Sequence, residues 1–181
     1  MMKMDFLKKI SSTFLIVVLA SCQYEPVDPK VPINPVKPQM NVAGKYKMIA
    51  YNTTIETDLN KDGVLSKNQM NETTCFNANY ITIQEDNTFL AGNDGITIVS
   101  DGIKNSLDCE YTLDISGTWE LNANILTLNF IQNNKNFTQQ FVVNKGTLTR
   151  NIEGEKIVSI SNSNAPIFLN SNVELIYTLN N

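Results

Sequence analysis

The strongest constraint on the fold of this chain is the alternation of apolar and polar residues, in short runs, after Pro38. Successive side chains point to opposite faces of a strand, so this pattern predicts half-buried antiparallel strands. Clusters of Asn, Asp and Gly, such as Asn122–Asn124 and Asn144–Gly146, separate the runs and tolerate turn geometry. The pattern therefore predicts an all-β fold.

Short turns between sequence neighbours are typical of an antiparallel meander, and about 8 to 10 strands can hide their edges by closing into a barrel. Some of the expected strands could fuse. They are Lys45–Tyr51, Tyr80–Gln84, Thr88–Ala91, Ile96–Ser100, Glu110–Ile115, Thr118–Leu121, Ile125–Ile131, Phe137–Val143, Thr147–Ile152, Lys156–Ser161 and Val173–Leu179.

The N-terminus has a lysine-rich start, a short apolar run and then Leu19-Ala20-Ser21-Cys22. This arrangement resembles the export signal of bacterial lipoproteins, in which the chain is cut before a cysteine that then carries acyl chains such as palmitate. Residues 1–21 are therefore expected to be removed and Cys22 to be lipidated. The alternative is an ordinary signal peptide with an incidental cysteine. The resemblance implies a lipid-anchored protein of the bacterial cell envelope, in the outer membrane, facing the periplasm or the surface.

Residues 22–41 are predicted to form a spacer, because five of the six prolines recur there at every third position. That period matches polyproline II, a stiff helix that rises ~3.1 Å per residue. A docking site for a domain that recognises Pro-x-x-Pro is the alternative. Residues 42–181 are long enough for one domain with a single core.

The 14 basic and 18 acidic residues include three lysines and one aspartate ahead of Cys22, so the mature chain has 11 basic and 17 acidic residues and a net charge of −6. This charge argues against nucleic acid as a partner. Past Cys22 no apolar run approaches the roughly 20 residues of a membrane-spanning helix, which leaves the acyl chains as the expected anchor.

Several short motifs in a fixed order resemble the lipocalin-like domains of bacterial lipoproteins. They are Gly44-Lys45-Tyr46, Cys75 ahead of Ile81 and Ile83, Glu85-Asp86-Asn87-Thr88-Phe89, Cys109, Gly117-Thr118-Trp119-Glu120-Leu121 and Ile125-Leu126-Thr127-Leu128. The resemblance spans Val42 to Leu179. It implies a lipocalin-like β-barrel, with Tyr46 at the position where lipocalins place a tryptophan that closes the bottom of the barrel.

Two functions from different classes fit such a barrel. The first is a binding module for a small apolar or amphipathic ligand. The second is a protein-interaction module, an envelope inhibitor or an accessory subunit, with a packed core. Alternation places large side chains inside the barrel, where they either line a pocket or fill it. The expected pocket residues are Trp119, Leu121, Leu128, Phe130, Phe141 and Tyr177.

Cys75 and Cys109 are the cysteines that remain once Cys22 is acylated. In an oxidising compartment two such thiols tend to pair, so we expect a disulfide. Metal binding or a reactive thiol has less support, because the chain has no histidine and no Cys-x-x-Cys motif.

Asp58-Leu59-Asn60-Lys61-Asp62-Gly63 matches the first half of an EF-hand calcium loop. Asp58, Asn60 and Asp62 would be ligands, with the Val64 carbonyl and Ser66 completing the pattern. The twelfth position is Gln69 rather than a bidentate glutamate, and Glu72 comes three residues late. The alternative is a solvated turn in which these side chains cap their own backbone.

Catalytic motifs are missing from the sequence. Without histidine the common general base is absent, and neither a nucleophile elbow nor a phosphate-binding glycine loop occurs. The carboxylates fall where turns are expected. We therefore expect a protein that is not an enzyme.

Overall fold

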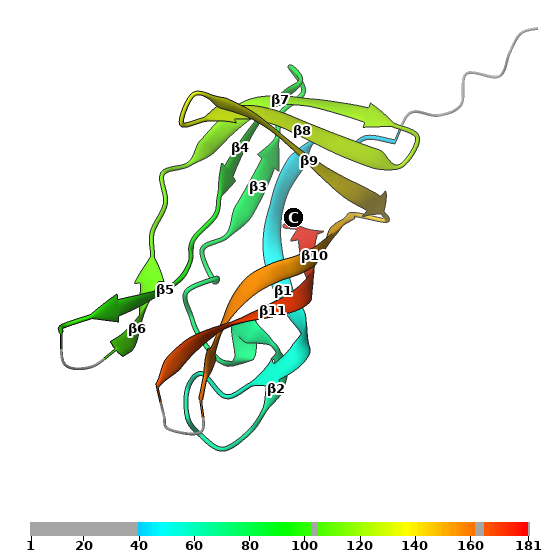
Figure 1. Ribbon diagram of the computed structural model, residues 1–181. Helices are drawn as coiled ribbons and strands as arrows, with labels where there is room; N and C mark the ends of the chain where they lie inside the picture. The colour runs from blue at the N-terminus through cyan, green and yellow to red at the C-terminus, as the bar shows by residue number, and fades with distance from the viewer. Residues whose placement is uncertain (1–39, 103–104, 162–164, 181) are drawn as a thin grey trace, which may run out of the picture. The chain divides into compact units, whose positions relative to one another are not determined.

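A computed structural model of the chain describes residues 40–102, 105–161 and 165–180 (Figure 1). The described residues belong to one compact unit, Pro38–Asn181. The predicted leader 1–21, Cys22 and most of the predicted spacer therefore lie outside the described residues.

The described residues contain eleven strands and one short 3-10 helix. The elements are β1 (Gly44–Thr57), β2 (Ser66–Asn68), η1 (Gln69–Asn71), β3 (Tyr80–Ile83), β4 (Thr88–Gly92), β5 (Gly95–Ser100), β6 (Asn105–Glu110), β7 (Ile115–Asn122), β8 (Ile125–Gln132), β9 (Lys135–Asn144), β10 (Thr147–Ile160) and β11 (Pro166–Leu179).

Eight antiparallel strands form a closed barrel in the order β1, β3, β4, β7, β8, β9, β10, β11. The ring closes where β1 pairs with β11, from Tyr46 opposite Leu179 to Thr53 opposite Val173. β2 pairs with β1 outside the ring, while β5 and β6 form a separate two-stranded sheet. The all-β antiparallel barrel expected from the alternation is confirmed.

One end of the barrel, here called the closed end, carries the short turns that follow β3, β7 and β9. At this end the start of β1 meets the residue after β11, because Asn180 N–H donates to the Lys45 carbonyl. The Trp119 indole N–H donates to the Gln84 carbonyl at 2.8 Å. Gly117 is required here, because a Cβ would overlap the Asn129 carbonyl oxygen of the next strand.

The core of the barrel consists of side chains that apolar–polar alternation along the expected strands places on the inward face. Of the fifteen, twelve are buried, and Trp119, Leu121 and Leu179 are partly buried against them. The fifteen are Tyr46, Met48, Ile81, Ile83, Phe89, Trp119, Leu121, Leu126, Leu128, Phe130, Phe141, Val143, Leu175, Tyr177 and Leu179. Period-two alternation therefore identified the buried face.

The opposite end, here called the open end, carries the short turn after β8 and the longer connections that contain β2 and the β5–β6 hairpin. β9 and β10 pair over three residues only, Val142–Asn144 with Thr147–Thr149, and then part. β10 and β11 continue together as a long hairpin. Figure 1 shows this hairpin and the β5–β6 hairpin extending from the same end of the barrel.

Two strand predictions are wrong in detail. Glu110–Ile115 is not a strand, because β6 ends at Glu110 and β7 begins at Ile115. The turn that Glu153-Gly154-Glu155 predicts between the expected strands Thr147–Ile152 and Lys156–Ser161 does not form, because both belong to β10, whose register with β11 shifts between Ile152 and Glu155. Gly154, at φ 64°, supplies the left-handed backbone of this bulge, which keeps Glu155 and Ile157 on the inward face.

Candidate ligand-binding site

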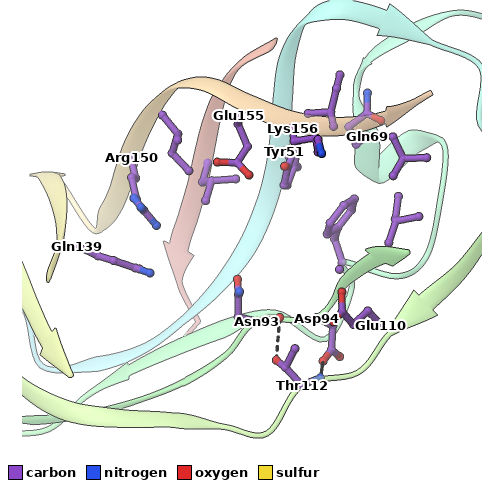
Figure 2. A pocket seen from close by; sticks show the side chains of 17 residues that line it. Tyr51, Gln69, Asn93, Asp94, Glu110, Thr112, Gln139, Arg150, Glu155 and Lys156 are labelled. Atoms are coloured by element: carbon purple, nitrogen blue, oxygen red, sulfur yellow. Dashed lines mark hydrogen bonds between the residues drawn. The ribbon is translucent and has the colours of Figure 1, made fainter. Parts of the chain in front are cut away.

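A cavity of about 440 Å³ lies at the open end (Figure 2). One wall comes from β1, β10 and β11, and the other from the ends of β4 and β6 together with β5. Because its walls belong to two different sheets, the cavity has opposing sides. Its size falls within the ~300 to 1,000 Å³ typical of small-molecule sites.

The wall on β10 places a cation over apolar side chains. Arg150, Ile152, Glu155 and Ile157 line it together, because they share the inward phase of the strand. Burial lowers the pKa of the half-buried Arg150, while Glu155 and Tyr177 oppose that effect. In the described part of the chain, the Arg150 side chain has no hydrogen bond or ion pair, so its donors open into the cavity.

Gln139 of β9 faces Arg150 across the gap where the two strands separate (Figure 2). Tyr51 of β1 also lines the cavity, with its ring stacked on Phe76 at 4.5 Å between centroids. Burial first and the Glu155 charge second raise the pKa of Tyr51 to about 12. The Tyr51 hydroxyl is therefore a neutral donor near neutral pH.

The opposing wall is held by a buried asparagine. The Asn79 side chain accepts from Asp94 N–H at 2.6 Å and donates to the Asp94 carbonyl at 3.0 Å. The Asp94 carboxylate in turn accepts from Thr112 N–H at 3.1 Å, and the Thr112 hydroxyl donates to the Asn93 carbonyl. These bonds join the two ends of the β5–β6 hairpin, as the dashed lines in Figure 2 show in part.

The predicted disulfide between Cys75 and Cys109 is confirmed, with sulfur atoms 2.06 Å apart. It joins β6 to the segment before β3 and so provides a second attachment of the hairpin that forms one cavity wall.

None of the six residues expected to form a ligand pocket lines the 440 Å³ cavity. Leu128, Phe130, Phe141 and Tyr177 are buried in the core, and Trp119 and Leu121 are partly buried. The internal space that Leu128, Phe130 and Tyr177 border is about 20 Å³, which is roughly room for one water molecule. These large side chains fill the barrel where we expected them to surround a ligand.

A second hollow, of about 560 Å³, lies along β7, β8 and β9 between Gly117 and Phe137. All three strands belong to one sheet, so the hollow has no opposing wall, and no charged residue lines it. The open-end cavity is therefore the better candidate for a specific site.

The predicted calcium ligands form a loop that bonds to itself. The Asp58 carboxylate accepts from Asp62 N–H and Gly63 N–H at 3.0 Å, and the Asp62 carboxylate accepts from Val64 N–H at 2.8 Å. Asn60 Oδ1 also accepts from Asp62 N–H. Among the described residues no three His, Cys, Asp or Glu side chains cluster in a way that could hold a metal.

The later positions of the calcium pattern are occupied by other bonds. The Ser66 hydroxyl donates to the Asn68 carbonyl. Gln69, at the twelfth position, is buried and bonds to Thr53 and Thr57. Glu72 accepts from Leu59 N–H at 3.0 Å. The geometry of the loop is that of the Asx-rich turn, and calcium binding at Asp58, Asn60 and Asp62 stays a prediction.

No protein-family model, no curated protein and no solved structure matches the chain. Among the residues that the structure describes, no helix is both long and apolar enough to cross a membrane. The closed barrel, the disulfide and the open-end cavity are therefore the observations from which a function must be argued.

Proposed function

We propose that this protein is a lipid-anchored protein of the bacterial envelope whose lipocalin-like barrel binds a small amphipathic molecule, without catalysing its conversion. The observation that carries the proposal is the 440 Å³ cavity, which combines an apolar base with a charged wall. The apolar residues favour the hydrocarbon part of a ligand, and the polar ones fix its orientation.

The packed core sharpens this proposal. A wholly apolar ligand would need space among the core side chains, where the void that Leu128, Phe130 and Tyr177 border is about 20 Å³. An amphipathic ligand instead needs only the open end, where Phe76, Ile157 and Leu175 meet charged neighbours.

Calorimetric titration with decanoate, decanol and decyltrimethylammonium tests the proposal, because the three share one chain and differ in head group. We expect saturable binding of at least one of them at one site per protein. Gln139→Trp should weaken that binding about tenfold or more by filling the cavity. Gln140→Trp is the matched control, because the adjacent residue is exposed and should leave binding unchanged.

Equal binding by the Gln139→Trp variant would place the ligand elsewhere, and absence of binding for all three compounds would reject the proposal. In that case a protein-interaction module would be the favoured function. Tyr111 and Leu113, in the connection between β6 and β7, favour it, because they are 78% and 92% exposed.

The anchor is tested separately. Cys22→Ala should move the full chain from the membrane pellet to the soluble fraction while the barrel stays folded. Unchanged pelleting would reject the lipoprotein proposal without affecting the cavity.

A further inference from the structure

The two cationic side chains that line the cavity, Lys156 and Arg150, differ in whether another group of the protein already contacts their charge. The Lys156 side chain is exposed, and its ammonium lies 5.0 Å from the Phe168 ring centroid, in a cation-π contact. The Arg150 guanidinium is half buried and has no ion pair in the described part of the chain. Arg150 is therefore the cation whose charge is available to a ligand.

The carboxylates of the cavity differ in the same way. Asp94 is engaged by Thr112 N–H in holding the hairpin. Glu110 is exposed on β6. Glu155 lies on the same strand as Arg150 and acts on it through space, but the two form no ion pair. The guanidinium is thus partly removed from water without direct compensation by a carboxylate.

The cavity that Arg150 lines also contains uncharged side chains that can donate hydrogen bonds. The Gln139 amide comes from β9, across the gap between the strands, and the Tyr51 hydroxyl comes from β1 (Figure 2). Burial holds the pKa of both Tyr51 and Tyr177 above the ordinary value, so neither adds negative charge near neutral pH. An acceptor that enters the cavity can meet several donors at once.

We propose that the ligand carries an anionic head group and that Arg150 recognises it, with Gln139 and Tyr51 as additional donors. This inference rests on the proposed function and names its ligand class: a small organic anion with an apolar body, such as a carboxylate or a sulfonate. A planar guanidinium binds such groups through two parallel charge-assisted hydrogen bonds. The apolar body lies toward Phe76 and Leu175.

The head-group series separates this inference from the proposed function. Decanoate should bind at least tenfold more tightly than decanol, and decyltrimethylammonium should bind most weakly. Equal affinity for all three would overturn the anion inference and leave the cavity proposal intact. Binding by none of them would overturn both.

Charge variants then assign the recognition to one side chain. Arg150→Gln should lower decanoate affinity about tenfold and leave decanol affinity nearly unchanged, whereas Arg150→Lys should retain part of the preference. Lys47→Gln is the matched control, because it removes one positive charge from the exposed face of β1. An equal loss in Lys47→Gln would assign the preference to general electrostatics.

Removing the negative charge of Glu155 should change the decanoate affinity in the opposite direction. Glu155→Gln should strengthen decanoate binding about two- to fivefold, because it removes repulsion from the incoming anion. Circular dichroism and thermal unfolding of each variant confirm the fold. A Glu155→Gln variant that is folded and binds decanoate more weakly would contradict the assigned placement of the head group.

Discussion

The two ends of the barrel use the same strands for different purposes. At the closed end, short turns join the strands, and buried side chains such as Tyr46, Leu126 and Phe141 pack the interior. At the open end, β9 and β10 part after three paired residues, and a cavity of about 440 Å³ follows. The comparison indicates that continuous pairing accompanies a packed core, whereas the separation of two strands at one seam accompanies a cavity.

The largest expected contrast is between core and cavity substitutions. Leu128 is 1% exposed, so Leu128→Ala should lower the free energy of unfolding by about 3 to 5 kcal/mol, through lost burial and an added void. Ile152→Ala, at the cavity wall, should cost less than about 1.5 kcal/mol, because that side chain is partly solvated already. Urea denaturation measures both. Equal losses would contradict the division into packed and open ends.

The disulfide attaches the cavity wall to the barrel. Replacing both Cys75 and Cys109 with serine should lower the free energy of unfolding by roughly 3 to 4 kcal/mol, because the reduced unfolded chain gains freedom over the loop between them. Decanoate should also dissociate faster, since the β5–β6 hairpin then loses its covalent attachment and is held by non-covalent contacts such as those of Asn79. Unchanged dissociation would show that the disulfide stabilises the chain without shaping the site.

Alkaline pH should weaken the fold through Tyr51 at the base of the cavity. Its pKa is raised from 10.0 to about 12 in the folded state, so the stabilising contribution is fully present below pH 10 and is lost as the pH rises toward 12. The loss should be roughly 2 to 3 kcal/mol. Tyr51→Phe should reduce this pH dependence in urea denaturation, while Tyr111→Phe, at an exposed position, serves as its control.

Trp119 distinguishes the two ends optically. Trp119→Phe should cost about 1 kcal/mol, because it removes the hydrogen bond to the Gln84 carbonyl. In the wild-type protein, saturating decanoate should leave Trp119 fluorescence unchanged, because the indole lies at the closed end. A large change would place the ligand among the six residues first expected to form the pocket.

The smallest effect is expected at Asp58–Gly63. Calcium, if bound, should bind with a dissociation constant on the order of 10⁻⁴ to 10⁻³ M, because the twelfth ligand position holds the buried Gln69. Calorimetry compares the wild type with an Asp58→Ala, Asp62→Ala variant. Identical heats would leave the Asx-rich turn as the account of this loop.

The closed end could be predicted well from the sequence, because alternation and turn residues are local signals. Alternation identifies which side chains face inward, and residues such as Asn87 and Gly146 supply the positive φ angles that the tight turns of this end require. The cysteine pair could also be predicted, since it follows from composition and compartment.

The open-end cavity could not be predicted in the same way, because it depends on long-range pairing. No local sequence pattern specifies that β9 and β10 separate, and the turn-forming residues Glu153–Glu155 occur within a continuous strand. A usable signal did exist. Arg150 has the same phase as Leu148 and Ile152, and Gln139 has the same phase as Phe141 and Val143. Polar residues at inward positions mark where a barrel stops being packed.

The most direct test is amide chemical-shift mapping of the mature chain with decanoate. The account predicts saturable shifts confined to Arg150, Ile157, Ile96 and their neighbours around the open-end cavity, with none at Leu126 or Leu128. Shifts centred on the closed-end core, or no saturable shifts at all, would contradict it.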